Sequence, residues 1–140
     1  MYQQMGYVAA LLTLAALSSE DIKKREISLV MLLLSGGAAI LYSLLGNSLS
    51  FPELLEKCLP GIGLLMLAFF TNGQMGCGDG AAIIVLGLWT CAKFALWTVY
   101  IGILFAGVVG FYILISGKKQ KELPLIPFLL ISMEVLLWNA

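Results

Sequence analysis

Two aspartates, Asp21 and Asp79, are the residues of this chain whose type and setting point to chemistry. Asp79 lies in the stretch "MGCGDG", where glycines surround a carboxylate between apolar runs, and Asp21 follows the first apolar run. Two carboxylates in a partly dehydrated site cannot both be ionised comfortably, so one pKa rises and the pair shares a proton. Such a pair can hydrolyse a peptide bond, because one aspartate takes a proton from the attacking water and the other donates to the carbonyl oxygen.

A purely structural explanation of both aspartates stays open. Asp79 precedes the apolar run "GAAIIVLG", so it could cap the N-terminus of a helix. The dipole of that helix would favour the ionised form of Asp79. Asp21 could form an ion pair with Lys24 or Arg25. The sequence by itself therefore allows either a reacting pair or two ordinary helix-end residues.

Three glycines, Gly76, Gly78 and Gly80, surround Asp79. Because glycine adopts backbone dihedrals that other residues avoid, we expect these residues to form a substrate-positioning loop that a substrate strand can approach closely. The chain contains no histidine, and its three cysteines form no Cys-x-x-Cys pair. The usual general base and the usual metal-ligand spacing are therefore missing, and we expect neither a metal nor another cofactor.

The remaining acidic residues have ordinary explanations. Glu20 and Glu26 flank a basic cluster at residues 23–25 and are expected to be its solvated partners. Glu134 lies well inside the last apolar run, where a carboxylate raises the question of function. That run is short, however, so a side chain that reaches the outer interface is the favoured explanation of Glu134.

Composition places the chain in a membrane. Of its 140 residues, 61% are hydrophobic and 11% are charged, against roughly 25% charged in a typical soluble domain. A soluble fold of this size has too little interior to bury that much apolar surface. The net charge is zero, so no overall field would attract nucleic acid. We therefore expect a single integral membrane domain over residues 1–140 and no nucleic-acid partner.

The hydrophobic pattern predicts an all-α, polytopic membrane bundle of about six transmembrane helices. Residues 81–116 would form one helix of about 54 Å, which exceeds the ~30 Å hydrocarbon core and predicts two spans that separate near Lys93. A polar loop is expected from Ser18 to Ser28, and an interfacial loop with a short amphipathic turn is expected to start near Pro52. The expected spans cover approximately residues 6–18, 29–45, 59–70, 81–91, 94–116 and 124–138.

The positive charges predict the side of the membrane that each loop occupies. Three of the eight Lys and Arg residues lie in the first loop and three in the fifth, whereas Lys57 and Lys93 lie in the second and fourth. Since positive residues collect in cytoplasmic loops, the first, third and fifth loops are expected in the cytoplasm. Asp21 and Asp79 would then lie on the cytoplasmic face of the inner membrane, at similar depth.

The order and spacing of these residues resemble the A24 family of membrane aspartic peptidases, the prepilin and preflagellin peptidases. Asp21 is followed six residues later by Ile27, with basic residues between them, and Gly-x-Gly-Asp follows after two further spans as Gly76–Asp79. The closing segment "LPLIPFLL", Leu123–Leu130, is similar to the Pro-Phe-rich start of the family's last helix. The resemblance covers nearly the whole chain, in the same order.

The resemblance implies a six-helix membrane peptidase whose catalytic pair is Asp21 and Asp79. The implied reaction is endoproteolytic removal of a short basic leader from type IV pilin-like precursors on the cytoplasmic side. Such a precursor and membrane lipids are the implied partners, and Glu20 and Glu26 are the expected contacts of the basic leader. Some members of the family pair up, which allows a homodimer.

The chain departs from the family pattern in three ways. "ISL", Ile27–Leu29, stands where the family usually has Ile-Pro-Asn, and Ala81 stands where many members carry a lysine. The large cytoplasmic loop with paired cysteines is absent, so the chain resembles peptidase-only members rather than those with N-methyltransferase activity. Ala81 keeps open a second interpretation, a weakly active or inactive relative that serves as a membrane subunit of a pilus or secretion system. A third, a small transporter, has only Glu134 in its favour.

Overall fold

The chain folds into an all-helical bundle. The computed structural model describes residues 2–24, 27–46, 50–70, 77–117 and 123–139, and within these ranges it contains no strand. The all-α fold predicted from the hydrophobic pattern is therefore confirmed. In chain order, the helices are α1 (Tyr2–Lys24), α2 (Leu29–Gly46), α3 (Phe51–Phe70), α4 (Cys77–Trp89), α5 (Ala92–Ile115) and α6 (Ile126–Asn139).

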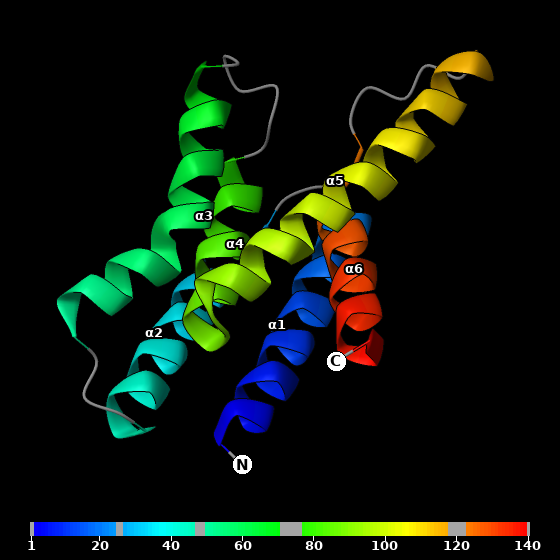
Figure 1. The fold of residues 1–140 in the computed structure, drawn as a ribbon. Helices are drawn as coiled ribbons and strands as arrows, with labels where there is room; N and C mark the ends of the chain where they lie inside the picture. The colour runs from blue at the N-terminus through cyan, green and yellow to red at the C-terminus, as the bar shows by residue number, and fades with distance from the viewer. Residues whose placement is uncertain (1, 25–26, 47–49, 71–76, 118–122, 140) are drawn as a thin grey trace.

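Successive helices run in alternating directions (Figure 1). The C-terminal ends of α1 and α3 and the N-terminal ends of α4 and α6 therefore point toward the same end of the bundle, drawn at the top of the figure. This alternation matters for the site, because it brings together chain segments that are far apart in sequence.

Three helices, α1, α2 and α5, are long and apolar enough to cross a membrane. The apolar helices α4 and α6 are shorter, with 13 and 14 residues, which corresponds to about 20 Å of helix axis. The predicted separation of residues 81–116 into two helices is confirmed, because α4 ends at Trp89 and α5 begins at Ala92.

Two of the predicted loops are wrong, because they are helical in the structure. Helix α1 continues through the polar stretch to Lys24, where the sequence predicts a loop from Ser18; this stretch has no glycine or proline, and Glu and Lys are good helix formers. Helix α3 already begins at Phe51, and Pro52 is tolerated in its first turn. Pro60 lies inside α3, and the helix is visibly bent (Figure 1), as expected when proline removes a backbone donor.

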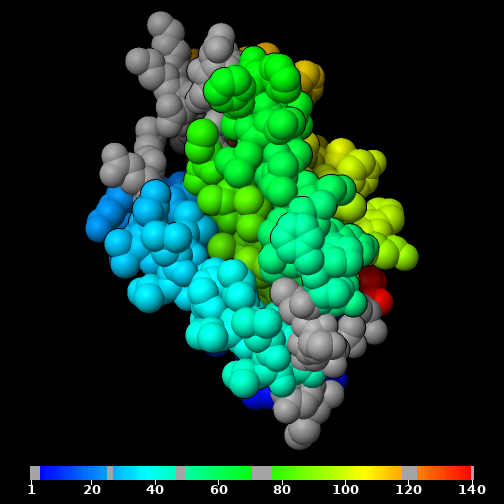
Figure 2. Space-filling model, turned by 90° about the vertical axis from the view of Figure 1, so that its left-hand side faces the viewer, coloured from blue at the N-terminus to red at the C-terminus, as the bar shows by residue number. Residues whose placement is uncertain are grey.

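Helix α4 lies in the middle of the bundle, in contact with α1, α2, α3 and α5. Figure 2 shows it between α2 and α3. Small residues allow neighbouring helices to approach α4 closely. A Cβ added to Gly87 would overlap the backbone carbonyl of Lys57, and a Cβ added to Gly61 would lie 2.8 Å from the carbonyl oxygen of Gly80. Backbone contact with α3 therefore fixes the position of α4.

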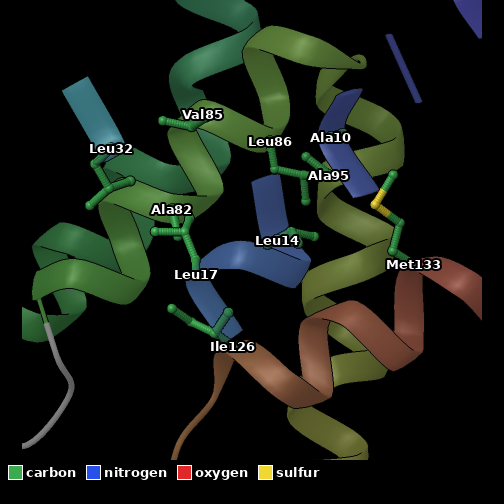
Figure 3. Close-up of a cluster of buried hydrophobic side chains, with 10 residues drawn as sticks. All are labelled: Ala10, Leu14, Leu17, Leu32, Ala82, Val85, Leu86, Ala95, Ile126 and Met133. Carbon is green, nitrogen blue, oxygen red and sulfur yellow. The ribbon is translucent and has the colours of Figure 1, made fainter. Parts of the chain in front are cut away.

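The largest buried cluster joins five of the helices (Figure 3). It consists of Ala10, Leu14 and Leu17 of α1, Leu32 of α2, Ala82, Val85 and Leu86 of α4, Ala95 of α5, and Ile126 and Met133 of α6. Burial of these side chains holds α1, α4 and α6 against one another. The neighbouring ends of these three helices carry the residues of the candidate site.

The outer surface of the bundle is apolar. Leu45, Phe69 and Trp138 are 86%, 84% and 92% exposed, and many further large apolar side chains are exposed on the other helices. Such a surface would be unfavourable in water over so wide an area, whereas lipid tails solvate it well. Together with the three spanning helices, this surface indicates a membrane protein.

Candidate active site

Asp21 and Asp79 lie at the same end of the bundle. Asp21 is in the last turn of α1, and Asp79 is in the first turn of α4. The two helices contact each other and run in opposite directions (Figure 1). The C-terminal end of α1 therefore lies near the N-terminal end of α4.

Asp21 is unusually buried for a carboxylate, with a side chain that is 8% exposed. The start of α6 packs near it, because the buried side chain of Ile126, the first residue of α6, lies in the same cluster as Leu17 of α1. Oxygen Oδ2 is buried and has no hydrogen-bond partner among the residues that the structure describes. Lys24, one of the two ion-pair partners that the sequence suggests, is exposed, and Arg25 lies outside the described residues. An unsatisfied buried polar atom calls for an explanation in function or strain.

Asp79 is partly buried and lies just ahead of the apolar residues of α4. Burial, as the larger cause, and the negative charge of Asp21 together raise the pKa of Asp79 from 3.8 to about 6. The helix dipole alone would favour the ionised form, so burial and the neighbouring charge outweigh it. Such a charge effect acts over short distances, and the contact between α1 and α4 places the two residues at one end of the bundle.

Gly78 and Gly80 are part of α4, where each contacts a neighbouring side chain. A Cβ added to Gly78 would lie 2.5 Å from Cδ1 of Ile27, and a Cβ added to Gly80 would lie 2.8 Å from Cγ of Leu65. These contacts explain why both positions are glycine. The role of Gly78 and Gly80 in positioning substrate stays a prediction, and Gly76 lies outside the described residues.

Glu20 joins the last turn of α1 to the start of α2. The backbone N–H of Ser28 donates a hydrogen bond of 3.3 Å to Oε2 of Glu20. The carbonyl of Ser28 accepts the first helical hydrogen bond of α2, from the N–H of Leu32 at 3.1 Å. Glu20 thus satisfies a donor at the helix start. Its role as a leader contact stays a prediction, as does that of Glu26, which lies outside the described residues.

Nothing in the sequence pattern marks Ile126 as a neighbour of Asp21. Its place beside the end of α1 depends on which faces of α6 and α1 meet in the bundle.

The arrangement provides two neighbouring carboxyl groups in a partly shielded site. Since the charge of one raises the pKa of the other, the pair can hold a single proton over a range of pH. One carboxyl can then accept a proton from water while the other donates one. This is the chemistry needed for hydrolysis of an unactivated bond without a nucleophilic side chain.

Comparison with known proteins agrees with the resemblance found in the sequence. The model of the type IV leader peptidase family matches residues 8–111, a range that includes Asp21 and Asp79 and ends before the Leu123–Leu130 segment. No curated protein and no solved structure matches the chain significantly. Because the family model covers well over half of the sequence, the chain belongs to the type IV leader peptidase family.

Proposed function

We propose that this protein removes the short basic leader of type IV pilin-like precursors by aspartyl hydrolysis at the cytoplasmic face of the membrane. Family membership supports a leader peptidase in general and implies pilin-like precursors as its substrates. The observation that carries the aspartyl mechanism is the coupling within the pair, since the charge of Asp21 contributes to the raised pKa of Asp79.

In the proposed first step, Asp21 is ionised and Asp79 is protonated. Asp21 takes a proton from a water molecule while the water oxygen attacks the carbonyl carbon of the scissile bond. Asp79 gives its proton to the carbonyl oxygen, so that this oxygen does not acquire a full negative charge. Asp21 is then protonated, Asp79 is ionised, and the substrate carbon carries two hydroxyl groups.

In the proposed second step, the bond between carbon and nitrogen breaks. The proton on Asp21 passes to the leaving amine, and Asp79 takes a proton from one of the two hydroxyl groups as the new carboxylic acid forms. Both aspartates return to their starting protonation states. Because Asp79 must begin protonated and its pKa is about 6, we expect the rate of processing to fall as the pH rises above that value.

The charges around the site support its assignment to the cytoplasmic side. Lys23 and Lys24 lie in the last turn of α1, next to Asp21, and positive residues favour the cytoplasm at the ends of membrane spans. The α1 helix is one of the three that are long and apolar enough to span.

The proposal is tested by replacing each aspartate with asparagine in the full chain. Asp21→Asn and Asp79→Asn should each reduce processing of a pilin-like precursor by more than about 100-fold, because each variant loses a group that exchanges protons. Glu134→Gln is the matched control, since it removes an exposed carboxyl group on α6. Processing by both asparagine variants at the wild-type rate would exclude the aspartyl mechanism.

A non-catalytic membrane subunit is the second candidate function, and Ala81 favours it. In place of the lysine of many relatives, Ala81 packs its partly buried side chain against the main hydrophobic cluster. The same assay separates the two candidates. An inactive subunit would leave the precursor uncut by wild type, whereas an added active family member would cut it.

A further inference from the structure

Within the described ranges, four polar or charged residues are buried: Ser18, Asp21, Thr98 and Ser132. The hydroxyl groups of Thr98 and Ser132 donate to backbone carbonyls of the preceding turn, at 2.9 and 2.8 Å, as buried polar groups require. Ser18 and Asp21 differ from them. Oδ2 of Asp21 has no hydrogen-bond partner among the described residues, and the hydroxyl of Ser18 forms no hydrogen bond within the same part of the chain.

Ser18 and Asp21 lie on the same face of α1, three residues apart. This face also carries Leu14 and Leu17, which belong to the main buried cluster (Figure 3). Side chains three residues apart on a helix have Cβ atoms about 5–6 Å from each other, and helical side chains lean toward the preceding turn. The carboxyl group of Asp21 therefore leans toward the turn that carries Ser18, so that two unpartnered polar groups are neighbours.

The surroundings of Asp21 provide no charged donor for its ionised form. The described helices packed against α1 bring the acidic Asp79 from α4, no charged side chain from α2, and no ionisable side chain from the first two turns of α6. Lys23 and Lys24 are exposed at the end of α1, where the helix dipole also disfavours an ionised carboxylate. A buried carboxylate needs hydrogen-bond donors, and a serine hydroxyl is such a donor.

We propose that Ser18 is the positioning residue of Asp21, and that its hydroxyl donates a hydrogen bond to Oδ2 when Asp21 is ionised. This inference rests on the function proposed above, in which Asp21 begins the reaction ionised. Rotation of the serine side chain between staggered positions brings the hydroxyl to the carboxylate. The hydrogen bond then stabilises the charge of Asp21 and fixes the orientation of its carboxylate.

Ser19 is a matched control, because it offers the same side chain at the next position on the outer surface. It is exposed, and its hydroxyl donates to the carbonyl oxygen of Ala16 at 2.7 Å. Ser18→Ala and Ser19→Ala thus remove the same atom from adjacent positions, of which only one faces Asp21. Alanine favours helix, so we expect both variants to fold. Ser18→Thr is the conservative variant, because it keeps the hydroxyl.

An infrared titration of the Asp21 carboxyl in an Asp79→Asn background tests the contact without any need for activity. In this background Asp21 is the one member of the pair that titrates, and its band is identified by its loss when Asp21 is also replaced by asparagine. We expect Ser18→Ala to raise the pH of the Asp21 transition by about one unit, since the charged form loses a hydrogen bond. Ser19→Ala and Ser18→Thr should leave the transition in place.

Two results of this titration would overturn the proposal. The first is a transition that Ser18→Ala does not shift. The second is an equal shift in Ser18→Ala and Ser18→Thr, which would attribute the effect to packing at position 18 and not to the hydroxyl.

The same shift should appear in catalysis by the full chain with both aspartates present. On the acid limb of the kcat profile for a pilin-like precursor, the rate is proportional to the ionised fraction of Asp21. A shift of one unit in Ser18→Ala therefore lowers kcat about tenfold at a fixed pH on this limb, with little change in KM. A purely structural role of Ser18 would lower stability and leave the acid limb unmoved.

The two proposals fail in different ways. Processing by Asp21→Asn and Asp79→Asn at the wild-type rate would refute the aspartyl mechanism, whereas a transition shifted by Ser18→Ala would still support the contact with Asp21. Inactive asparagine variants together with an unshifted transition would refute only the role of Ser18.

Discussion

Ile27 lies directly against Gly78, so that a Cβ at position 78 would come within 2.5 Å of Cδ1 of the isoleucine and 3.3 Å of its Cβ. Ile27 also packs against the main buried cluster. The contact joins the segment that follows Asp21 to the turn that carries Asp79. These two parts of the sequence are separated by two helices, yet each limits the position of the other.

Gly78→Ala should therefore impair the site, and Ile27→Val should partly restore it. Alanine stabilises a helix by about 1 kcal/mol relative to glycine. An added methyl group in a tightly packed region, however, destabilises the folded protein by about 1–3 kcal/mol. Ile27→Val removes the Cδ1 atom that is closest to the new methyl group. Precursor processing and thermal stability of the two single variants and the double variant measure the coupling.

Gly107→Ala is the control for this pair, because a Cβ at Gly107 has no neighbour within 4 Å. It should leave processing near the wild-type level. Equal losses from Gly78→Ala with and without Ile27→Val would show that the contact between the two residues is not what constrains position 78.

Gly61→Ala and Gly63→Ala should differ strongly, although the two positions are two residues apart in α3. A Cβ at Gly61 would lie 2.7 Å from the backbone nitrogen of Ile84 and 2.8 Å from the carbonyl oxygen of Gly80, whereas a Cβ at Gly63 meets nothing within 4 Å. Backbone atoms cannot move aside as a side chain does, so Gly61→Ala should push α3 away from α4.

We therefore expect Gly61→Ala to lower the melting temperature and to reduce processing, since Gly80 is next to Asp79. Gly63→Ala should match or exceed the wild-type stability because of its better helix propensity. Thermal unfolding of both variants in detergent micelles checks this expectation, which a stable Gly61→Ala variant would contradict.

The stability of the protein should depend on pH through Asp79. The pKa of its carboxyl group is about 6 in the folded protein, against 3.8 for an exposed aspartate. Between these values the folded protein keeps a proton that the unfolded chain has lost, so stability should fall as the pH rises from 3.8 to about 6 and then stay low. Asparagine cannot ionise and should remove this penalty.

Asp79→Asn should accordingly be more stable than wild type above pH 6, and this advantage should shrink as the pH falls toward 3.8. Melting temperatures measured across this range test the sign of the effect, with Glu134→Gln as the control for loss of a carboxyl group. An advantage of Asp79→Asn that grows toward low pH would show that the environment of Asp79 favours its ionised form.

Two substitutions of Glu20 should separate its structural contact from a role in leader binding. Glu20→Gln keeps an oxygen that can accept the hydrogen bond from the N–H of Ser28, so stability should be retained. Glu20→Ala removes the acceptor at a helix start, which typically costs about 0.5–2 kcal/mol. If Glu20 also attracts the basic leader, Glu20→Gln should raise KM while the melting temperature stays constant.

An unchanged KM in Glu20→Gln, together with a lower melting temperature in Glu20→Ala, would restrict Glu20 to the contact with Ser28. A precursor whose leader lysines are replaced by glutamine serves as the control substrate. Its KM should not respond to Glu20→Gln, because the attraction between opposite charges is already removed.

The helical class of the fold and the placement of the two aspartates at one end of the bundle could be predicted because they follow from simple regularities. Length limits predict a break within residues 81–116, and the structure has it between Trp89 and Ala92. The number of spans between Asp21 and Asp79 predicts that the two lie on one side. Both arguments depend on the thickness of a bilayer and not on details of side-chain packing.

The errors occur where local preference and hydrophobicity disagree. The stretch up to Lys24 is polar, which suggests a loop, but its residues form helices well, and α1 continues through it. The place of Ile126 beside the end of α1 could not be predicted in the same way, because it depends on how α6 packs against α1. Hydrophobic periodicity identifies helices and their ends, whereas it carries no information on which backbone group meets which side chain.

The shortness of α4 has a consequence for the lipid around the site. Its 13 residues span about 20 Å, whereas the 24 residues of α5 span about 36 Å. Neighbouring helices of such different length cannot both match one bilayer thickness, so we expect the leaflet to thin beside α4. Lipid headgroups and the water around them would then lie closer to Asp79, so that water could reach the two aspartates from the surrounding leaflet.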